Sequence, residues 1–426
     1  MNLVMPYGEG LVQAPMPHGQ PLGTIEIQEA PPLPRVVEAI RKAINNPIGS
    51  DRGLFDLVNP GERITILVSD EFRLTGAEHV VPVLVNGLNE AGIPDAAIRI
   101  VFATGAHRPP TESEQTRILG EVMWNRLRSQ LHVHDPRDRA NLAYVGSTSR
   151  GTPVELNRRA LDCDRLVATG AVVLHYFAGF GGGRKSIVPG IASIETIAHN
   201  HAMNLDPYQD RLNPAVQIGA LNGNPVAEDM LEAARLIRVD FIVNTVLDRH
   251  GRIAAAFAGE LDAAHRAAAQ CARERFAVAI RGKADLVIAS AGPAKNFVQS
   301  HKALFNAYQA VKPDGRIVFL AQCQEGLGGE QFTQWLRLGS PEHIFAELRK
   351  HSEINGQTAL STLQKTPITD MVTDLCDADV ELLGARKAHS LAQAIARALD
   401  ALTAAGQTDP TYYLMPSACY TVPFPT

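Results

Sequence analysis

The chain has 426 residues, of which 45% are hydrophobic and 20% are charged, and its 40 basic and 45 acidic residues give a net charge of −5. This balance is typical of a globular protein and excludes a disordered chain. A mildly acidic chain without a basic cluster is also a poor candidate for nucleic-acid binding. The length predicts two domains.

No apolar run approaches the roughly 20 residues that span a bilayer, and the first residues lack the pattern of a secretory signal. The five cysteines are scattered along the chain, and no two of them have CxxC spacing. This usage argues against a disulfide scaffold or a zinc ribbon and favours a reducing, cytoplasmic compartment. We therefore expect a cytoplasmic protein with neither a membrane nor a nucleic acid as partner.

Short apolar runs alternate with stretches of helical spacing along the whole chain. Expected strands occupy residues 63–70, 97–105, 165–173, 241–247, 284–292, 315–321 and 378–384, and expected helices residues 78–91 and 261–280. The alternation predicts an α/β fold with mainly parallel sheets. A polar break at residues 281–283 predicts a first domain of residues 1–281 and a second of 282–426.

Chemically reactive side chains follow the ends of three of these strands, where ligands gather in α/β folds. Asp70 and Arg73 follow the first strand, His107 follows the second, and His175 follows the third. A histidine in such a turn suits general acid–base catalysis. Arg73 could clamp a carboxylate or phosphate, or it could form a surface ion pair with Asp70 or Glu71.

Residues 175–190 read HYFAGFGGGRKSIVPG and form the densest motif in the chain. Glycines permit tight turns whose N–H groups can face an anion. A phosphate-binding P-loop would need a glycine at the position of Arg184, so that pattern fails, although Arg184 and Lys185 could still hold a phosphate.

Three further pairs of polar residues remain ambiguous by spacing alone. His199 and His201 cannot share one helix face, so at most one of them is a metal ligand, and each could be an ordinary histidine. His132 and His134 would share a face of a strand, but a structural turn at residues 135–136 is the favoured interpretation. Gln299 and Lys302 share a helix face that suits an anionic substrate, or that is simply polar surface.

Together these segments resemble one family, the nickel-pincer-nucleotide lactate racemases and their homologues. The residues that match run in order from residue 6 to about residue 305. They are Pro6-Tyr7-Gly8, Asp70, Arg73, Thr104-Gly105, His107-Arg108, His134-Asp135, residues 175–190, Asn200-His201, Gln299 and Lys302. The segment at 175–190 is the most specific of these.

The resemblance implies roles for individual residues, with the active site in a cleft between two α/β domains. Lys185 would carry the nickel-pincer nucleotide, a pyridinium mononucleotide, through a thioamide. His201 would be the protein ligand of Ni(II), whose square-planar geometry suits this set. His107 and His175 would be catalytic. Further cofactor contacts would come from Asp70, Thr104, Gly182, Gly183 and Arg184, and the substrate carboxylate would be held by Arg73, Gln299 and Lys302.

The implied activity is that of an isomerase, a racemase or epimerase that inverts C2 of a 2-hydroxy acid. Hydride leaves C2 for the cofactor and returns to the other face of a 2-oxo acid intermediate, while histidines move the hydroxyl proton. Separate maturation proteins would be transient partners. Val298 stands where the lactate enzymes commonly have a tyrosine, which predicts a substrate larger than lactate.

Two other functions remain open from the residues alone. A zinc-type hydrolase could use His107, His175 and His201, although it would lack an HExxH arrangement and leave Lys185 without a role. A non-catalytic nucleotide-binding protein would not need histidines at two strand ends.

Overall fold

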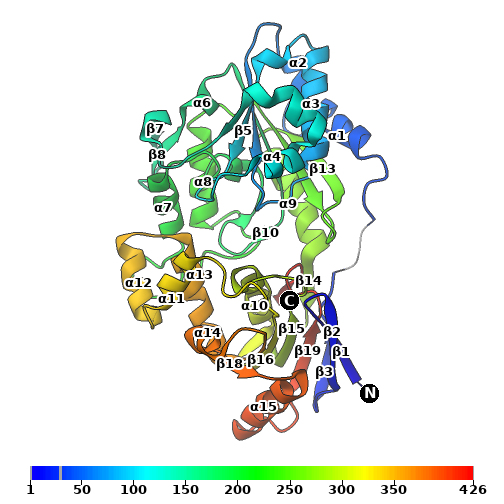
Figure 1. The fold of residues 1–426 in the computed structure, drawn as a ribbon, viewed down its shortest axis with the longest axis vertical. Helices are drawn as coiled ribbons and strands as arrows, with labels where there is room; N and C mark the ends of the chain where they lie inside the picture. The colour runs from blue at the N-terminus through cyan, green and yellow to red at the C-terminus, as the bar shows by residue number, and fades with distance from the viewer. Residues whose placement is uncertain (1, 28–30, 426) are drawn as a thin grey trace. The chain divides into compact units, whose positions relative to one another are not determined.

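The computed structural model describes residues 2–27 and 31–425, and the chain forms two compact units (Figure 1). The central unit comprises Glu29–Arg275, and the terminal unit comprises Met1–Gln28 together with Phe276–Thr426. This division differs from the expected domains, because Met1–Gln28 joins the C-terminal part. The cause is β3 (Gln20–Thr24), which pairs in parallel with β19 (Thr411–Met415), a contact between distant segments that leaves no local signal.

The central unit contains a six-stranded sheet in the order β13-β12-β9-β4-β5-β6. All pairings in it are parallel except that of β12 with β13. The strands are β4 (Ile64–Ser69), β5 (Ile98–Ala103), β6 (Leu131–Val133), β9 (Arg165–Ala171), β12 (Phe241–Leu247) and β13 (Ile253–Gly259). The four strands expected in this part of the sequence are therefore present, within a few residues of their expected bounds.

Helices cover both faces of this sheet, with α1 to α3 on one side and α6 and α8 on the other (Figure 1). Alternate residues of β4 reach the core that α3 closes, because successive strand side chains point to opposite faces. The helices are α1 (Val36–Asn45), α2 (Leu54–Leu57), α3 (Ala77–Glu90), α4 (Glu112–Leu119), α5 (Glu121–Leu127), α6 (Arg158–Leu161), α7 (Ile194–Ala202), α8 (Pro225–Arg235) and α9 (Ala263–Phe276). Two small hairpins are added, β7 (Leu142–Ser147) with β8 (Pro153–Asn157) and β10 (Leu174–His175) with β11 (Gly179–Phe180).

The terminal unit contains a second six-stranded sheet, in the order β18-β17-β16-β15-β19-β3, with every pairing parallel. Its remaining strands are β15 (Ala284–Ser290), β16 (Val311–Leu320), β17 (Thr369–Val372) and β18 (Arg386–Ala388). The hairpin of β1 (Asn2–Tyr7) with β2 (Gly10–Pro15) packs with α15 (Leu391–Ala404) on one face. The other helices are α10 (Phe297–Ala310), α11 (Glu330–Leu336), α12 (Pro341–Lys350), α13 (Ile354–Leu363) and α14 (Asp377–Leu382), and β14 (Ala277–Ile280) pairs with β20 (Val422–Pro425).

The strand expected at residues 378–384 is wrong, because this segment forms helix α14. Asp377 and Asp379 lie in its first turn, where acidic side chains interact favourably with the helix dipole. Val380 is its one buried side chain, so the segment does not have the apolar face of a core strand. The strands of this region lie on either side of it, as β17 and β18.

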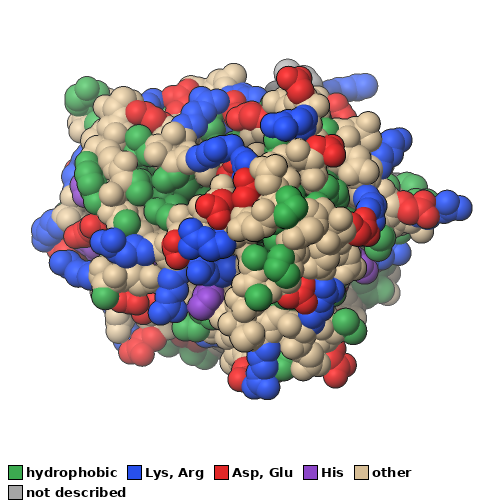
Figure 2. Space-filling view, turned by 90° about the horizontal axis from the view of Figure 1, so that it is seen from above, with side chains coloured by type: hydrophobic (Ala, Val, Ile, Leu, Met, Phe, Trp, Pro, Cys, Tyr) green, Lys and Arg blue, Asp and Glu red, His purple; other side chains and the backbone are tan. Residues whose placement is uncertain are grey.

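The surface shown in Figure 2 carries Lys and Arg side chains interspersed with Asp and Glu, without one dominant basic patch. Surface ion pairs between described residues include that of Arg63 with Asp162 at 2.8 Å. Among the described residues, no helix combines the length and the hydrophobicity needed to cross a bilayer.

Candidate active site

The carboxyl ends of β4 and β5 bring Asp70 and His107 together. Asp70 Oδ2 lies 2.7 Å from His107 Nδ1, and Asp70 Oδ1 accepts a hydrogen bond from the Phe72 backbone N–H at 3.0 Å. The carboxylate is 2% exposed, whereas the imidazole is 37% exposed. Because a carboxylate can only accept, Nδ1–H of His107 donates to it, and Nε2 is the atom that can take up a proton.

His175 belongs to the small β10–β11 hairpin that follows β9. Its Nδ1 accepts from the backbone N–H groups of Phe177 and Ala178 at 3.4 and 3.3 Å, and its Nε2 lies 3.1 Å from Nζ of Lys185. Two donors facing Nδ1 require the ring proton to be on Nε2 in the neutral imidazole. His175 therefore presents an N–H donor to the lysine amine.

Lys185 lies on a short 3₁₀ turn, residues Gly183–Ser186. Loss of hydration lowers the pKa of Lys185 well below its usual range, and the positive charge of Arg73 lowers it further. An amine in its neutral form accepts the hydrogen bond from His175 Nε2–H, which agrees with the tautomer set by the backbone. A neutral lysine amine is also a nucleophile, whereas an ammonium is not.

His201 is buried on α7, with 5% exposure. Burial lowers the pKa of His201 to about 3. Its imidazole is therefore neutral, which is the form that binds a metal. The Phe177 ring packs against the other three side chains of this site. Its centroid lies 4.8 Å from that of the His201 ring, 4.5 Å from that of the His175 ring and 5.1 Å from Lys185 Nζ.

Helix α7 is anchored at both ends, which fixes the position of His201. At its start the Ser193 hydroxyl accepts from the Thr196 backbone N–H at 3.1 Å, a normal N-terminal cap. Near its end the Asn200 amide donates to the buried carboxylate of Asp229 at 2.9 Å. His199 is exposed on the same helix.

The glycines before Lys185 are required by close packing of the loop on its own unit. Gly182 and Gly183 have φ values of 69° and 52°, which favour glycine. A Cβ on Gly182 would lie 2.5 Å from the Asn244 side-chain oxygen, which accepts a hydrogen bond from the Gly183 backbone N–H at 2.8 Å. The structure thus gives a packing reason for both glycines, and their contact with a cofactor stays a prediction.

The Arg184 side chain is buried within its own unit, and its expected contact with the cofactor or a phosphate stays a prediction. Its guanidinium is 2% exposed and pairs with Asp262 at 2.8 Å. It also contacts Nδ1 of His265 at 3.1 Å and donates to the Ala227 carbonyl at 3.2 Å. Burial lowers the pKa of Arg184 to about 10, so the group remains charged at neutral pH. Arg184 therefore points into the interior, whereas Lys185, the next residue, faces His175.

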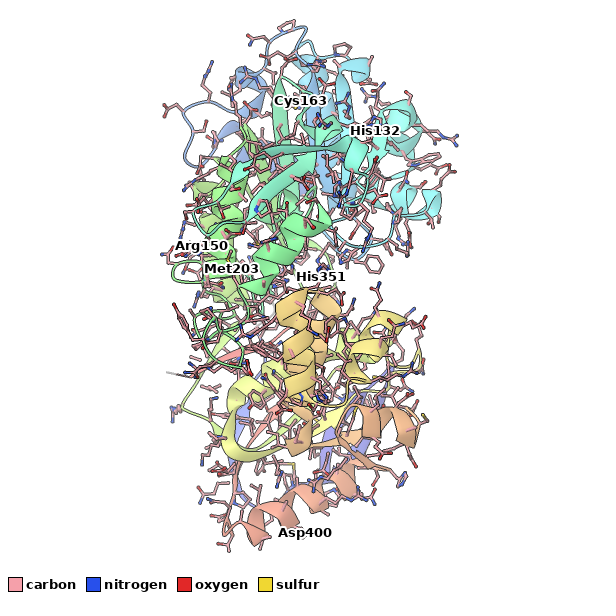
Figure 3. All side chains as sticks on the ribbon, turned by 90° about the vertical axis from the view of Figure 1, so that its left-hand side faces the viewer. His132, Arg150, Cys163, Met203, His351 and Asp400 are labelled. Carbon is pink, nitrogen blue, oxygen red and sulfur yellow. The ribbon has the colours of Figure 1, made fainter. Side chains whose placement is uncertain are left out.

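Thr104 and His134 connect loops, and neither side chain faces an open site. The Thr104 hydroxyl donates to the His134 carbonyl at 2.9 Å, and both residues are buried. The two ring nitrogens of His134 lie 2.9 Å from the Ala192 carbonyl oxygen and 3.1 Å from the Asn157 amide. His132, labelled in Figure 3, lies beside Arg159. The favoured interpretation of residues 132–136 as a structural segment agrees with these contacts.

The expected carboxylate-binding residues belong to both units. Arg73 is exposed after β4, where its guanidinium donates to the Phe72 carbonyl at 3.1 Å. Gln299 and Lys302 are exposed on α10 of the terminal unit, and the Gln299 amide oxygen accepts from the Lys295 backbone N–H at 3.1 Å. Their shared function, and the expected cleft between domains, stay predictions.

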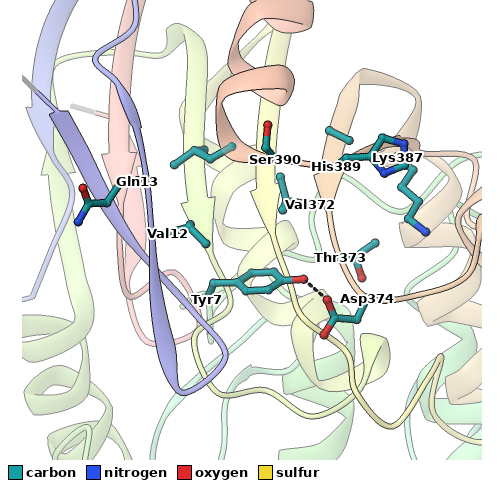
Figure 4. Close-up of a pocket in the computed structure, with 11 residues that line it drawn as sticks. Tyr7, Val12, Gln13, Val372, Thr373, Asp374, Lys387, His389 and Ser390 are labelled. Carbon is teal, nitrogen blue, oxygen red and sulfur yellow. Dashed lines mark hydrogen bonds between the residues drawn. The ribbon is translucent and has the colours of Figure 1, made fainter.

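A cavity of about 440 Å³ in the terminal unit contains none of the expected site residues (Figure 4). It lies between the β1–β2 hairpin and the carboxyl ends of β17 and β18. Within it, the Tyr7 hydroxyl donates to Asp374 Oδ1 at 2.7 Å, and burial together with this bond raises the pKa of Tyr7. This bond fastens the hairpin to the end of β17.

The described residues contain no group of three or more His, Cys, Asp or Glu side chains that could hold a metal ion. His107, His175 and His201 therefore do not form the three-ligand set that a zinc hydrolase needs. The residues that sequence reasoning did not single out are Phe177, Asn244, Asp262 and His265. Phe177 lies inside the motif at 175–190, but the other three carry no recognisable spacing signal.

In the central unit, an oriented histidine follows β5, a second histidine lies beside a lysine whose pKa is lowered by burial, and a neutral imidazole is buried on α7. Residues 7–211 match the family model of the lactate racemase N-terminal domain, and residues 280–409 match that of the lactate racemase C-terminal domain. The chain therefore belongs to the lactate racemase family, and it is an isomerase of the racemase type.

Individual relatives agree with this assignment. A lactate racemase from Thermoanaerobacterium thermosaccharolyticum is 34% identical over 79% of this chain and 78% of its own length. One from Lactiplantibacillus plantarum is 35% identical over 69% of this chain and 68% of its own length. The solved structure of the T. thermosaccharolyticum lactate racemase apoprotein superimposes with a TM-score of 0.86 at 28% identity, over 100% of both chains. A protein from Thermotoga maritima shares the fold alone, with a TM-score of 0.65 at 16% identity over 94% of this chain and 100% of its own.

Proposed function

We propose that this protein racemises or epimerises C2 of a 2-hydroxy acid with a nickel-pincer nucleotide attached to Lys185. The observation that carries the proposal is the position of the Lys185 amine, 3.1 Å from His175 Nε2 and beside the same phenyl ring as His201, where burial lowers the pKa of Lys185. Membership of the lactate racemase family supports the reaction type.

The residues fit such a cofactor. The Lys185 amine faces an imidazole and not a carboxylate, and burial lowers its pKa, which favours the neutral form that can make a covalent bond. His201 supplies one neutral imidazole. Since the described residues offer no complete metal-binding group, a metal at this place needs further ligands from a bound molecule. When bound, the cofactor would supply the hydride chemistry at C2.

The protein's own contribution is binding and proton transfer. His107, oriented by Asp70, would take the hydroxyl proton of one enantiomer at its Nε2. His175 would serve the other enantiomer at its own Nε2, which can act as a base only after the proton that it now directs at the free Lys185 amine has left. Two bases are needed because the two enantiomers present the hydroxyl from opposite sides, and each returns its proton in the reverse direction. Arg73, Gln299 and Lys302 would hold the carboxylate while C2 changes its configuration.

We further propose that the substrate is larger than lactate. Val298 replaces the tyrosine that the lactate enzymes commonly carry, which removes a hydroxyl and frees volume. Val298 lies against Gly328, since a Cβ on Gly328 would be 2.8 Å from a Val298 methyl group. A survey of 2-hydroxy acids in which lactate gave the highest kcat/KM would contradict this part of the proposal.

The cofactor proposal is tested by producing the protein together with the maturation proteins that we expect as transient partners. Intact denatured mass and elemental analysis should show an added mass on the Lys185 peptide and nickel in about a one-to-one ratio. Lys185→Ala should lose the added mass. His201→Ala should lose nickel, while His199→Ala, on the exposed side of the same helix, should retain it. A protein without added mass and with zinc would overturn the proposal.

A further inference from the structure

A buried polar group lies beneath the turn that carries Lys185. Arg184 Nη2 is 2.8 Å from Asp262 Oδ1 and 3.1 Å from His265 Nδ1, and Nη1 donates to the Ala227 carbonyl at 3.2 Å. Asp262 directly precedes α9, and His265 lies in its first turn. The guanidinium is therefore held by the start of α9 and by the backbone of α8.

His265 connects this group to the glycine-rich loop. Its Nε2 lies 2.8 Å from the Gly181 carbonyl oxygen, which can only accept, so Nε2 carries the proton and Nδ1 accepts from Arg184. Burial and the neighbouring Arg184 charge lower the pKa of His265 to about 3, so the ring stays neutral. The ring also packs on the loop, because a Cβ on Gly183 would lie 2.5 Å from His265 Cδ2.

Stability alone is a weak explanation for these residues. Burying an ion pair costs about as much hydration energy as the attraction between the two charges returns. Proteins in which apolar residues replace such a pair are often no less stable. Asp262 additionally pairs with Arg266 at 2.9 Å, so its carboxylate connects Arg184 to the side of α9. The bonds of Asp262 and His265 to this loop hold the turn in a single orientation, because they fix the Arg184 side chain and the Gly181 carbonyl, which lie one and four residues before Lys185.

We propose that Arg184, Asp262 and His265 are positioning residues that hold the Gly181–Ser186 turn so that the Lys185 amine stays against His175. Arg184 and Lys185 are consecutive residues on one 3₁₀ turn, so fixing the Arg184 side chain in the interior directs Lys185 toward the hairpin. The inference rests on the proposed function for its purpose, the attachment of the cofactor, but the restraint on the turn is independent of it.

The test compares two substitutions that separate the ring's hydrogen bonds. His265→Gln can keep an N–H donor for the Gly181 carbonyl, whereas His265→Asn is too short to reach it. Arg184→Lys keeps the positive charge but loses the planar guanidinium group, whose two terminal nitrogens contact Asp262, His265 and Ala227 at the same time. A matched control is Arg165→Lys, because Arg165 is also largely buried and pairs with Glu62 and Asp240, at the start of β9.

Two measurements are made on each variant, below its unfolding temperature. Hydrogen–deuterium exchange of the apoprotein reports opening of the 181–187 peptide, and intact mass after production with the maturation proteins reports the fraction of chains that carry cofactor. His265→Asn and Arg184→Lys should exchange faster in this peptide and lose about tenfold or more of the cofactor-bearing fraction. His265→Gln and Arg165→Lys should retain both values within about twofold.

The proposal is overturned if His265→Asn and Arg184→Lys keep wild-type exchange in this peptide, or if they exchange faster and still load fully. An equal loss of loading in Arg165→Lys would also overturn it, since general destabilisation would then explain the effect. If His265→Asn does not fold, Arg184→Lys decides the question. If the wild-type protein takes up no added mass, the cofactor assignment fails, while the exchange data still decide whether these residues hold the turn.

Discussion

Asp70 and His107 come from the ends of two neighbouring parallel strands, and 2.7 Å separates Oδ2 of the buried carboxylate from Nδ1 of the half-exposed imidazole. The carboxylate fixes both the ring orientation and the tautomer, which leaves Nε2 unprotonated. A histidine without this partner could rotate or carry its proton on the wrong nitrogen.

Asp70→Asn should therefore lower kcat for racemisation by roughly 100-fold, because the amide can donate to Nδ1 and place the ring proton on Nε2. Cofactor mass and nickel content should not change, which separates this effect from failed loading. Chiral chromatography of the product in both directions measures the rate. Glu71→Gln is the control, since the neighbouring Glu71 pairs with Arg117 and not with a histidine. Equal rates for Asp70→Asn and wild type would remove Asp70 from the mechanism.

A comparison of two glycine variants tests how tightly the Lys185 loop is packed. Gly183→Ala places a methyl group 2.5 Å from His265 Cδ2, whereas Gly151→Ala has a similarly positive φ of 84° but no atom within 4 Å of its Cβ. Both variants carry backbone strain of about 1 kcal/mol. Gly183→Ala should lose a further 1–3 kcal/mol, as a rough range, from overpacking. Urea unfolding of the two apoproteins gives the difference, and equal losses would mean that the His265 ring moves aside freely.

The sequence predicted much of the fold, because alternation of apolar strands with helices is a local pattern. The four central strands and α3 follow directly from it. The prediction of a strand at residues 378–384 was wrong, because a short apolar run suits a helix as well as a strand. Asp377 and Asp379 lie in the first turn of the helix that forms there. The pairing of β3 with β19 could not be predicted from the sequence, because pairing between strands at the two ends of a chain leaves no pattern in either segment alone.

The candidate site divides in the same way. Asp70, His107, His175, Lys185 and His201 lie in motifs that stand out by residue type and by position after strands. The direction in which a side chain points could not be predicted from the sequence. Arg184 and Lys185 are consecutive cations in a glycine-rich turn, and they look equivalent in the sequence. Their difference comes from Asp262 and His265 in an alanine-rich helix, and no spacing rule connects those residues with the turn.

We expect Lys365 to make the free energy of unfolding of the terminal unit depend on pH. Its ammonium is 4% exposed, donates to the Ser361 hydroxyl and carbonyl at 2.8 and 3.0 Å, and lies about 5 Å from the rings of Phe305 and Tyr308. Burial lowers the pKa of Lys365 to about 7. Because the unfolded lysine keeps its proton up to a pH near 10, the unfolded state binds more protons between these values. This destabilising contribution is full below about pH 7 and is relieved as the pH rises toward 10.

Lys365→Met should therefore raise the free energy of unfolding at pH 7 by about 1–3 kcal/mol. The gain is reduced by the stabilisation that the lost contacts with the aromatic rings and the lost hydrogen bonds to Ser361 provide. The gain should shrink as the pH approaches 10, which urea titrations at pH 7, 8.5 and 10 would show. Lys350→Met is the control, since Lys350 is 68% exposed and pairs with Glu347 on the surface. A gain independent of pH would assign the effect to packing and not to the buried charge.

Val298→Tyr should move substrate preference toward lactate. The substitution returns a hydroxyl donor and adds side-chain volume, so a larger 2-hydroxy acid should lose space while lactate gains a contact. A change of this size is worth about 1–3 kcal/mol, or roughly tenfold to a hundredfold in the ratio of the two kcat/KM values. Val298→Phe fills the same volume without the hydroxyl, so it separates exclusion of the larger acid from hydrogen bonding to lactate. Rates for both acids, normalised to the cofactor-bearing fraction, give the ratio. An unchanged ratio in both variants would show that residue 298 does not face the substrate side chain.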